Sequence, residues 1–387
     1  MELYQNNDSI TTLIFWGVFL RKILELCLSP DTGGLELYMV RASHYLHESG
    51  MNITSVINET GNLEKYYQNT DCKYKKLKKY TAVLSFISAK KLAKIIDDNG
   101  ITVVHIHWTK DLPVAVLAKL ISKQKPKLIQ TRHMTMTRFK DDFYHRFLYK
   151  NIDLMLAVTK QVKEQIEKFI PIDVVPNVEV LYIGADKPEA IDLEDKKALR
   201  DKYNLQRSFI VGIIGRIEES KGQYLVIEAI KKLVRKNIDA KALIVGHAMN
   251  DNYLNNLKDN IEKEKINDKV IFTGFTTKVQ RLMQLCDVIV LATDKETFGL
   301  VLIEAMQCEI AVIASDSGGP LEIIDNNKSG LFFKSKESDD LAQKLEILYR
   351  DEKLRESIAT AGKLKANEKF CSEKQFKKLK YILSSFK

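Results

Sequence analysis

Residues 209–235 read FIVGIIGRIEESKGQYLVIEAIKKLVR, a stretch that passes from an apolar run through a glycine turn into an amphipathic segment. The run from Phe209 to Ile214 is continuous and apolar, which predicts a buried strand that ends at Gly215. The segment from Gly222 to Arg235 repeats its apolar residues at helical spacing and predicts a helix. A strand that leads through a glycine turn into a helix is the repeating unit of a parallel α/β sheet.

The same alternation recurs along both halves of the chain. In the first half, a strand from Lys22 to Leu28 is followed by a turn that contains Gly33 and Gly34 and by a helix through about His47. Further strands or short apolar runs are expected at Ile53–Ile57, Ile101–Ile106, Leu128–Thr131, Leu154–Val158, Asp173–Val175, Ala242–Val245, Val270–Thr273, Val288–Ala292 and Ala311–Ala314. The sequence therefore predicts an α/β protein with two doubly wound domains.

The length of 387 residues supports two domains rather than one. The alternating pattern fades into a charged segment, so we expect a first domain over 1–185, with 1–21 as an extension, a linker over 186–206 and a second domain over 207–368. The remaining residues, 369–387, are expected to form a helix that returns to the first domain. Two such sheets form a cleft where the carboxyl ends of their strands face each other, and ligands bind at such ends.

Composition excludes several classes of protein. The five cysteines are scattered and contain no Cys-x-x-Cys pair, so neither a disulfide framework nor a structural zinc site is expected, and a reducing cytosol fits best. The net charge of +9 fits a nucleic acid, an anionic membrane or an anionic substrate equally. The apolar run over 13–20 is too short to span a bilayer. A secretory signal has positive charge before its apolar run, whereas here the positive charge follows it, so we expect the run to pack on the body or touch a membrane.

Part of the positive charge is concentrated between Lys73 and Tyr80, where five lysines alternate with Tyr74 and Leu77. Two interpretations stay open for this segment. It is either a solvated loop or helix face, or a patch that rests on anionic lipid head groups or faces a charged acceptor.

The strongest candidate site is the segment from Glu296 to Met306, directly after a predicted strand. Phe298, Gly299 and Leu300 open a helix whose free N–H groups and dipole suit a diphosphate. Glu304, about one turn into that helix, can accept hydrogen bonds from ribose hydroxyls. Glu296 precedes the turn and would lie beside the group attached to the distal phosphate. The alternative is a capped amphipathic helix with two incidental acids.

Two further glycine turns follow strands of the second half. Arg216 and Lys221 flank the first of them, after Gly215, and a cationic pair there can neutralise a departing diphosphate. The alternative is a pair of merely solvated basic residues. The second turn, Ser315 to Pro320, contains Gly318 and Gly319 and is expected to close the donor pocket from the other side.

Together these residues resemble the retaining nucleotide-sugar glycosyltransferases of glycosyltransferase family four, which have the GT-B architecture of two Rossmann-like domains facing across a cleft. The resemblance covers almost the whole chain from about Lys22. It is carried by Gly33-Gly34, Val104-His105-Ile106-His107, the Gly-Arg…Lys-Gly turn at 215–222, and two glutamates separated by seven residues that lead into Gly318-Gly319. The chain departs from the family at Glu309 and Ala311, where a glycine and a proline are common.

The resemblance implies a role for each matched position. Arg216 and Lys221 would contact the diphosphate, Glu304 the ribose and Glu296 the transferred sugar. It also implies a histidine near the reacting centre after a strand of the first domain. His133 matches that place and His107 is the second choice.

Other residues of the first half are expected near the ligands. Gly33 and Gly34 would approach the donor phosphate or the acceptor with bare backbone. Arg132 and His107 are assigned to the acceptor side.

The implied reaction is sugar transfer with retention of configuration, in which the leaving phosphate helps to deprotonate the acceptor hydroxyl. The donor is expected to be a UDP- or GDP-sugar, and the acceptor a glycan or a lipid-linked glycan of a bacterial surface polysaccharide, lipopolysaccharide or glycoconjugate. No obligatory metal is expected, since the sequence has no Asp-x-Asp. The enzyme would be cytoplasmic, and contact with the inner face of the membrane is an open alternative.

Rival functions lack their signatures. A nucleic-acid-binding protein would show a zinc finger, RRM or KH pattern, and none is visible, so no nucleic-acid partner is expected. A dinucleotide-dependent oxidoreductase would need Gly-x-Gly-x-x-Gly, whereas Gly212 and Gly215 have the wrong spacing. A nucleotide-sugar epimerase on the same scaffold stays an alternative that product analysis distinguishes.

Overall fold

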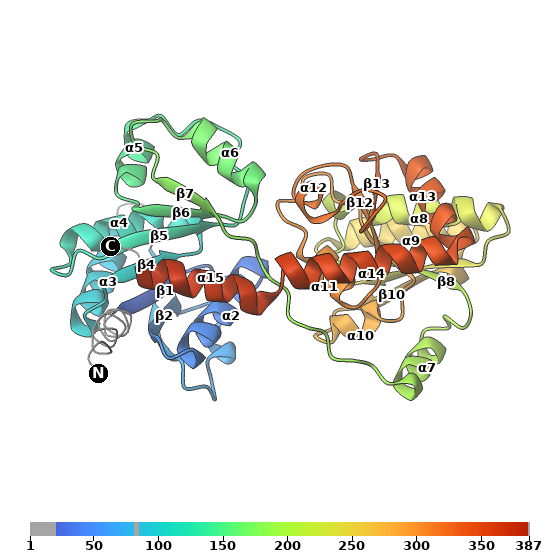
Figure 1. The fold of residues 1–387 in the computed structure, drawn as a ribbon, viewed down its shortest axis with the longest axis horizontal. Coiled ribbons are helices and arrows are strands. Elements are labelled where there is room, and N and C mark those ends of the chain that lie inside the picture. The colour runs from blue at the N-terminus through green and yellow to red at the C-terminus, as the bar shows by residue number, and fades with distance from the viewer. Residues whose placement is uncertain (1–20, 81–84, 386–387) are drawn as a thin grey trace, which may run out of the picture. The chain divides into compact units, whose positions relative to one another are not determined.

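A computed structural model describes residues 21–80 and 85–385 (Figure 1). The predictions made for the apolar run at 13–20 and for the extension up to residue 20 lie outside the described residues. The chain divides into two compact units, one formed by residues 1–182 and 375–387 and the other by residues 183–374. None of the helices in the described part of the chain combines the length and apolarity needed to cross a bilayer.

The first unit is built on one parallel seven-stranded sheet with the order β3-β2-β1-β4-β5-β6-β7. Its strands are β1 (Lys22–Cys27), β2 (Asn52–Asn58), β3 (Lys73–Leu77), β4 (Val103–Ile106), β5 (Lys127–Arg132), β6 (Leu154–Ala157) and β7 (Asn177–Val180). Its helices are α2 (Gly34–Glu48), α3 (Ser85–Asn99), α4 (Leu112–Ile121), α5 (Phe143–Lys150) and α6 (Lys160–Phe169), with most of α15 (Ser372–Ser385). The strand order reverses between β1 and β4, which is where ligands bind in such sheets.

The second unit is built on a parallel six-stranded sheet with the order β10-β9-β8-β11-β12-β13. Its strands are β8 (Phe209–Ile214), β9 (Ala240–Val245), β10 (Val270–Gly274), β11 (Val288–Leu291), β12 (Ala311–Ser315) and β13 (Leu331–Phe333). Its helices are α7 (Leu193–Lys202), α8 (Gln223–Arg235), α9 (Asp251–Lys263), α10 (Val279–Met283), α11 (Leu300–Gln307), α12 (Pro320–Ile323), α13 (Ser338–Arg350) and α14 (Glu352–Lys369). The order reverses between β8 and β11, as in dinucleotide-binding sheets.

The strands that carry continuous apolar runs are buried along nearly their whole length. In β8 the side chains of Ile210 and Val211 are fully buried, and the same is true of Val288 and Ile289 in β11. Helices cover both faces of a doubly wound sheet, so such strands have no solvent-facing side and show no polar alternation. This burial explains why the apolar runs predicted the strands.

Two segments differ from the sequence predictions. The lysine-rich stretch expected as a loop or helix face contains β3, an edge strand that pairs with β2 and leaves Lys73, Lys75 and Lys76 exposed. Exposed lysines are common on edge strands because they discourage pairing with another chain. The apolar run at Asp173–Val175 is a turn, in which the Val175 amide donates to the Pro171 carbonyl at 2.9 Å, and the strand β7 begins after it.

The segment predicted as a linker, 186–206, contains the helix α7, which lies in the second unit. Asp192 caps α7 by accepting a hydrogen bond from the Asp195 amide at 2.7 Å. From the last turn of α7, Arg200 donates to the carbonyl oxygen atoms of Leu285 (2.9 Å) and Ser208 (3.2 Å). These bonds fasten the helix to the second unit.

The helix α15 begins in the second unit and continues as part of the first. In the first unit, the Phe376 ring packs against Tyr38 and Tyr45 of α2, with ring centroids 5.6 and 5.5 Å apart. The Lys380 ammonium donates to the Ser49 carbonyl at 2.8 Å, just after α2 ends. The C-terminal residues are therefore packed on the first unit.

Candidate functional site

The turn after β8 is built on glycines. Gly222 ends a short 3-10 helix (Glu219–Lys221) in the left-handed conformation, with φ at 74°, and begins α8. A Cβ atom at Gly222 would lie 2.6 Å from the Ala292 carbonyl oxygen, so only glycine lets the turn approach the end of β11 this closely. The close approach holds Arg216 and Lys221 beside the residues that follow β11.

The turn after β11 opens α11. Gly299 takes the left-handed conformation, with φ at 101°, and no side chain caps the helix that starts at Leu300. The N–H groups at the start of a helix point outward and carry the positive end of its dipole. The segment therefore has the features of an anion site that its sequence predicted.

The turn after β12 supports the same site from its other side. The Gly319 amide donates to the Glu296 carbonyl oxygen at 2.9 Å. A Cβ atom on Gly318 would lie 2.2 Å from that oxygen, and one on Gly319 would lie 2.4 Å from the Phe298 carbonyl oxygen. The glycine pair thus fixes the backbone on both sides of Thr297.

One ion pair links two of the predicted residues, and a second joins Arg216 to Glu218 of its own turn. The Lys221 Nζ lies 3.4 Å from the Glu296 Oε2, and the Arg216 Nη2 lies 3.3 Å from the Glu218 Oε1. The Arg216 side chain is 56% exposed and the Lys221 side chain 26% exposed, so both cations remain accessible to a ligand. The structure therefore brings Arg216, Lys221 and Glu296 together within the second unit.

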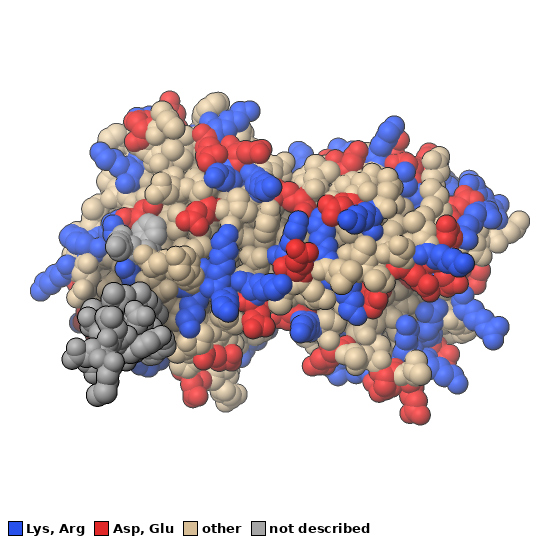
Figure 2. Space-filling model, in the orientation of Figure 1, with Lys and Arg blue, Asp and Glu red and all other residues tan. Residues whose placement is uncertain are grey.

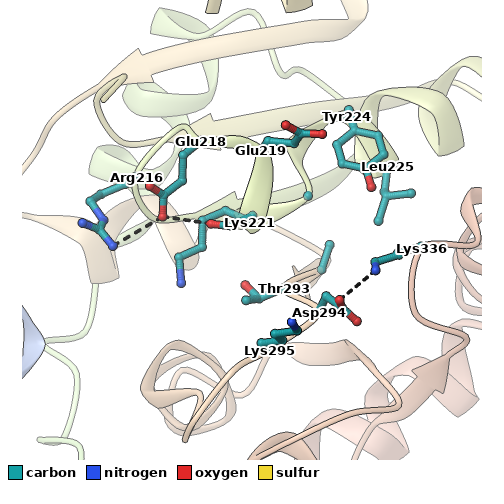
Figure 3. A pocket seen from close by; sticks show the side chains of 13 residues that line it. Arg216, Glu218, Glu219, Lys221, Tyr224, Leu225, Thr293, Asp294, Lys295 and Lys336 are labelled. Carbon is teal, nitrogen blue, oxygen red and sulfur yellow. Dashed lines mark hydrogen bonds and ion pairs between the residues drawn. The ribbon is translucent and has the colours of Figure 1, made fainter. Parts of the chain in front are cut away.

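A cavity of about 520 Å³ lies beside the two cations (Figure 3). Figure 3 shows that its walls come from the turn after β8 and from the residues that follow β11, with Lys336 on a third side. Its charged lining residues are Arg216, Lys221, Lys295, Lys336, Glu218, Glu219 and Asp294. The hydrogen bond from Lys336, whose Nζ lies 2.9 Å from Asp294, lowers the pKa of that carboxyl.

Glu296, Phe298, Gly299, Leu300 and Glu304 are not among the lining residues of this cavity. Glu304 lies in the second turn of α11 and is partly exposed. The predicted donor-binding residues therefore fall into two neighbouring groups in the second unit. Arg216 and Lys221 line the cavity, and the other residues lie at the start of α11.

The first unit holds a buried polar cluster where its own strand order reverses. β1 and β4 pair so that Glu25 stands opposite His105. The Glu25 Oε2 lies 2.6 Å from the His107 Nε2 and 2.9 Å from the His105 Nδ1, and all three side chains are fully buried. The His105 Nε2 lies 2.7 Å from the Thr131 hydroxyl, which ties β5 to the cluster.

This cluster is the one group in the described part of the chain with the donor set and the closeness of a metal site. Ligand atoms about 2 Å from a zinc ion lie about 3.3 Å apart. The separations of 2.6 and 2.9 Å are shorter and are those of direct polar contacts. The residues therefore fit a hydrogen-bonded cluster better than a metal centre.

The pKa values of the cluster are strongly shifted. Burial, reinforced by the neighbouring His105, lowers the pKa of His107 to about 4, although Glu25 opposes the change. Burial acts to raise the pKa of the Glu25 carboxyl, but His105 and the hydrogen bonds of both histidines outweigh it and lower the pKa to about 2. At neutral pH the cluster thus combines an ionised carboxylate with a neutral His107.

His133 packs against this cluster. Its ring lies edge-on to Tyr38, with centroids 5.0 Å apart, and is stacked on His107 at 5.8 Å. Burial, together with the nearby His107, His105 and Arg132, holds the pKa of His133 well below its ordinary value. The buried His133 Nε2 has no hydrogen-bond partner in the described chain, so the neutral imidazole keeps one unused nitrogen.

Arg132, assigned to the acceptor side, is 7% exposed, and its guanidinium is bonded to nearby oxygen atoms. It donates to the carbonyl oxygen atoms of Met134 (2.8 Å) and Thr135 (2.9 Å) and to the Thr109 hydroxyl (3.0 Å). These bonds hold the loop that carries His133, which makes Arg132 a positioning residue.

The Gly33-Gly34 turn begins α2. The Gly33 amide donates to the Glu36 Oε2 at 2.9 Å, as in a capping box, and a Cβ atom on Gly34 would meet nothing within 4 Å. Gly34 is thus free of steric constraint within the first unit.

Two family profiles match the chain in succession. The profile described as "Glycosyl transferase 4-like" matches residues 25–162, and the profile described as "Glycosyl transferases group 1" matches residues 195–365. The chain belongs to the glycosyltransferases. Its two Rossmann-like units are those of the GT-B architecture, and the predicted resemblance to family four is confirmed.

This glycosyltransferase is similar to several named proteins. It is 27% identical over 296 residues to the N-acetyl-alpha-D-glucosaminyl L-malate synthase of Bacillus anthracis, covering 74% of this chain and 75% of that protein. It is 23% identical over 355 residues to the capsular polysaccharide biosynthesis glycosyltransferase CapM of Staphylococcus aureus, covering 88% and 92%. Among solved structures, HepE of Anabaena in complex with UDP superposes with a TM-score of 0.83 at 21% identity, covering 94% of this chain and 100% of that one.

Several residues of the donor cavity and of the buried cluster in the first unit were not predicted from the sequence. Lys336, Asp294 and Tyr224 line the cavity, and Glu25 organises the histidines. Lys336 follows β13 and carries no local motif. Glu25 offered one signal, an acid within the otherwise apolar run of β1.

Proposed function

We propose that this enzyme moves a hexose, with retention of configuration, from a nucleotide-diphosphate sugar to a hydroxyl group of a glycan or lipid-linked acceptor. The observation that carries the proposal is the meeting of Arg216, Lys221 and Glu296 beside the uncapped start of α11. A departing diphosphate needs cations and free N–H groups, and these supply both.

The roles of the donor-side residues follow from their chemistry. Arg216 and Lys221 neutralise the diphosphate, and the N–H groups after Phe298 and Gly299 bind its oxygen atoms. Glu304 accepts hydrogen bonds from the ribose. Glu296 binds the hydroxyl groups of the transferred sugar, and its 3.4 Å contact with Lys221 links the sugar position to the phosphate position.

For the transfer step we propose front-face attack, in which the leaving phosphate takes the proton of the acceptor hydroxyl. The protein then supplies position and charge stabilisation. His133 belongs near the reacting centre, where its neutral imidazole binds a hydroxyl group without adding charge. His107 supports the His133 ring, and Gly34 allows backbone to approach a ligand.

We propose a UDP- or GDP-sugar as donor and no obligatory metal, because two cations and a helix start are available for the diphosphate. The UDP complex of HepE and the name of CapM support a nucleotide donor and a bacterial polysaccharide or related glycoconjugate as destination.

For its location we propose the cytoplasmic face of a membrane. The net charge of +9 supports contact with anionic lipid, as do the Lys and Arg side chains gathered over α15 in Figure 2. The sequence of α15 contains four lysines, Lys374, Lys377, Lys378 and Lys380. Sedimentation with anionic vesicles, compared with neutral ones, tests this contact. Equal sedimentation with both would contradict it.

The main experiment is a thermal-shift panel of UDP-, GDP- and ADP-sugars. A ligand that binds only the folded chain raises the melting temperature. At a concentration about one hundred times its dissociation constant, it adds about 2.7 kcal/mol to the free energy of unfolding. No shift with any nucleotide would overturn the proposal. Product analysis with the active donor then separates transfer from epimerisation, which would return an isomerised donor and no new glycosidic bond.

A further inference from the structure

A second cavity, of about 660 Å³, lies wholly within the first unit and has no role in the donor chemistry above. Its lining residues follow the carboxyl ends of four strands, with Leu28 after β1, Asn58 at the end of β2, Lys79 after β3 and Trp108 after β4. The strand order reverses there, between β1 and β4, and ligands bind at such a point in doubly wound sheets.

We propose that this cavity is the acceptor site and that it takes a sugar that carries a phosphate group. The proposal rests on the proposed function, because an acceptor presupposes sugar transfer. It identifies the chemical class of the acceptor, which neither the family nor the donor site specifies.

Two ammonium groups of the cavity lie close to one indole ring. The Lys79 Nζ lies 3.9 Å from the centre of the Trp108 ring, and the Lys110 Nζ lies 5.3 Å from it. Both distances are within the range of cation–π attraction, which holds the two charges beside the ring. The cavity therefore presents two positive charges at one wall.

Lys79 is fixed in place by a buried carboxylate. Its ammonium donates to the Asp111 Oδ1 at 2.7 Å and to the Lys110 carbonyl at 2.8 Å, and its side chain is 12% exposed. The other oxygen of Asp111 accepts from the Leu28 amide at 2.7 Å. These two hydrogen bonds use two of the three ammonium protons, and the third side of the ammonium faces the Trp108 ring.

Lys110 is different, because it is exposed and makes no ion pair with any described residue. Its charge is therefore uncompensated within the described chain. Together with Lys79, which shares its charge with Asp111, the wall retains a net charge of about +1 beside the ring. This is a site for an anion.

Aromatic side chains supply the rest of the recognition. Trp108, Tyr80 and Tyr144 line the cavity, and Tyr144 is half exposed. Aromatic rings offer flat apolar faces and, in tyrosine, a hydroxyl group at the edge. A sugar ring, with apolar C–H faces and hydroxyl groups on its rim, complements such a lining.

The cations favour a phosphate over a carboxylate. A phosphate monoester carries about 1.5 to 2 negative charges at pH 7 and three strong acceptor oxygen atoms, whereas a carboxylate carries one charge and two oxygen atoms. The cations that line this cavity are both lysines. A sugar phosphate therefore fits the lining better than a sugar acid does.

The position of the tryptophans makes a direct test feasible. The chain has two tryptophans, Trp16 and Trp108, so Trp16→Phe leaves the cavity residue as the single tryptophan, whose fluorescence can be excited selectively. We expect glucose 1-phosphate to change the fluorescence of this variant in a saturable manner. Methyl glucoside, which lacks the phosphate and its charge-assisted contacts with the lysines, should bind about tenfold more weakly or worse, a loss of about 1.4 kcal/mol or more.

Matched lysine variants locate the charge that matters. Lys110→Ala should raise the dissociation constant of glucose 1-phosphate about fivefold, which is the upper value for the loss of an exposed ion pair. Lys75→Ala removes the same charge from the exposed edge of β3 and should change nothing. Lys79→Ala would leave the Asp111 carboxylate unpaired and destabilise the fold, so the paired change Lys79→Met with Asp111→Asn tests Lys79 instead.

A second arm distinguishes two sources of the phosphate. A polyprenyl diphosphate-linked sugar in detergent micelles is compared with empty micelles and with glucose 1-phosphate. A response that depends on Lys110 supports the proposal with either probe, and a response to the lipid-linked probe alone identifies the lipid-linked source.

Several results would overturn the inference. One is equal binding of methyl glucoside and glucose 1-phosphate. Another is an equal change in the dissociation constant of glucose 1-phosphate in Lys110→Ala and Lys75→Ala. The third is the absence of a fluorescence response to any probe. Thermal shift by UDP is measured in parallel, because it reports on the donor site alone. A Trp108 response without any nucleotide shift would refute the proposed function and leave the anion site standing.

Discussion

The two strand reversals of the molecule hold their polar groups in opposite ways. After β8 and β11, Arg216 and Lys221 remain partly in water and lie near acids. After β1 and β4, Glu25 and His107 are fully buried. A cation that must meet a diphosphate stays hydrated until the ligand arrives, whereas an imidazole stays neutral at low pH only when water is excluded. The contrast suggests electrostatic binding in one unit and fixed hydrogen-bonding geometry in the other.

Removing Lys221 is the largest test of this contrast. We expect Lys221→Ala to slow transfer by about 10²–10³, the range seen when one preorganised charge-stabilising donor is lost. Folding should change little, because the side chain is accessible and its ion pair with Glu296 is part-exposed. Turnover with a nucleotide sugar and the melting temperature measure the two effects.

Lys353→Ala is the matched control, since Lys353 is exposed on α14 of the same unit. It removes one charge from the second unit without altering the donor site. If Lys221→Ala and Lys353→Ala turn over at the same rate, Lys221 has no part in the reaction.

The buried cluster predicts a loss of stability in acid. An unfolded histidine takes up a proton near pH 6.5, but His107 does so only near pH 4 in the folded chain. Acid therefore favours the unfolded chain, so this contribution is complete above pH 6.5 and is lost as the pH falls toward 4. The free energy of unfolding falls by about 3 kcal/mol over this range, because each unit by which the His107 pKa is lowered corresponds to about 1.4 kcal/mol. Urea unfolding at a series of pH values measures it.

The control for the acid effect compares two histidines. His107→Gln keeps an N–H donor for Glu25 but cannot titrate, so the slope of stability against pH should flatten. His247→Gln alters an exposed histidine of the second unit and should leave the slope unchanged. An unchanged slope in His107→Gln would show that the cluster does not resist protonation.

The glycine turns of the donor site give an intermediate effect. Gly222 and Gly274 have nearly the same left-handed conformation, with φ at 74° and 75°, but only Gly222 faces backbone, at 2.6 Å from the Ala292 oxygen. Gly274→Ala should cost about 1 kcal/mol for the conformation alone. Gly222→Ala should cost about 1 kcal/mol more and weaken UDP binding. Urea unfolding and UDP titration of both variants provide the comparison, and equal losses of stability would refute the steric explanation.

Sequence reasoning succeeded where the signal was local. The apolar runs of β8 and β11 predicted buried strands. The glycines at 215 and 222 marked the turn that carries Arg216 and Lys221, and Gly299 marked the turn that opens α11. It failed for β3, whose residues are mostly exposed lysines and show no apolar face. A strand that depends on pairing at the edge of a sheet leaves little trace in its own composition.

Contacts between distant segments were also beyond the sequence. Glu25 meets His105 only because β1 and β4 pair in parallel with that register. Lys336 reaches the donor cavity from the loop after β13, and its 2.9 Å contact with Asp294 spans a long stretch of chain. Neither pair has a spacing that a local pattern could reveal.

The smallest test concerns a position where the family commonly has glycine. Glu309 follows α11 in the left-handed conformation, with φ at 59°, which costs a residue with a side chain about 1 kcal/mol. Its carboxylate lies 2.8 Å from the Lys363 ammonium, an exposed pair worth about 0.5 kcal/mol. Glu309→Gly relieves the strain but loses the pair and the 3.1 Å hydrogen bond from the Thr360 hydroxyl, so we expect a net gain of at most about 0.5 kcal/mol. Glu309→Gln keeps the strain, loses the pair and should be less stable than either. Chemical denaturation ranks the three proteins, and a glycine variant less stable than the glutamine variant would mean that the backbone here is not strained.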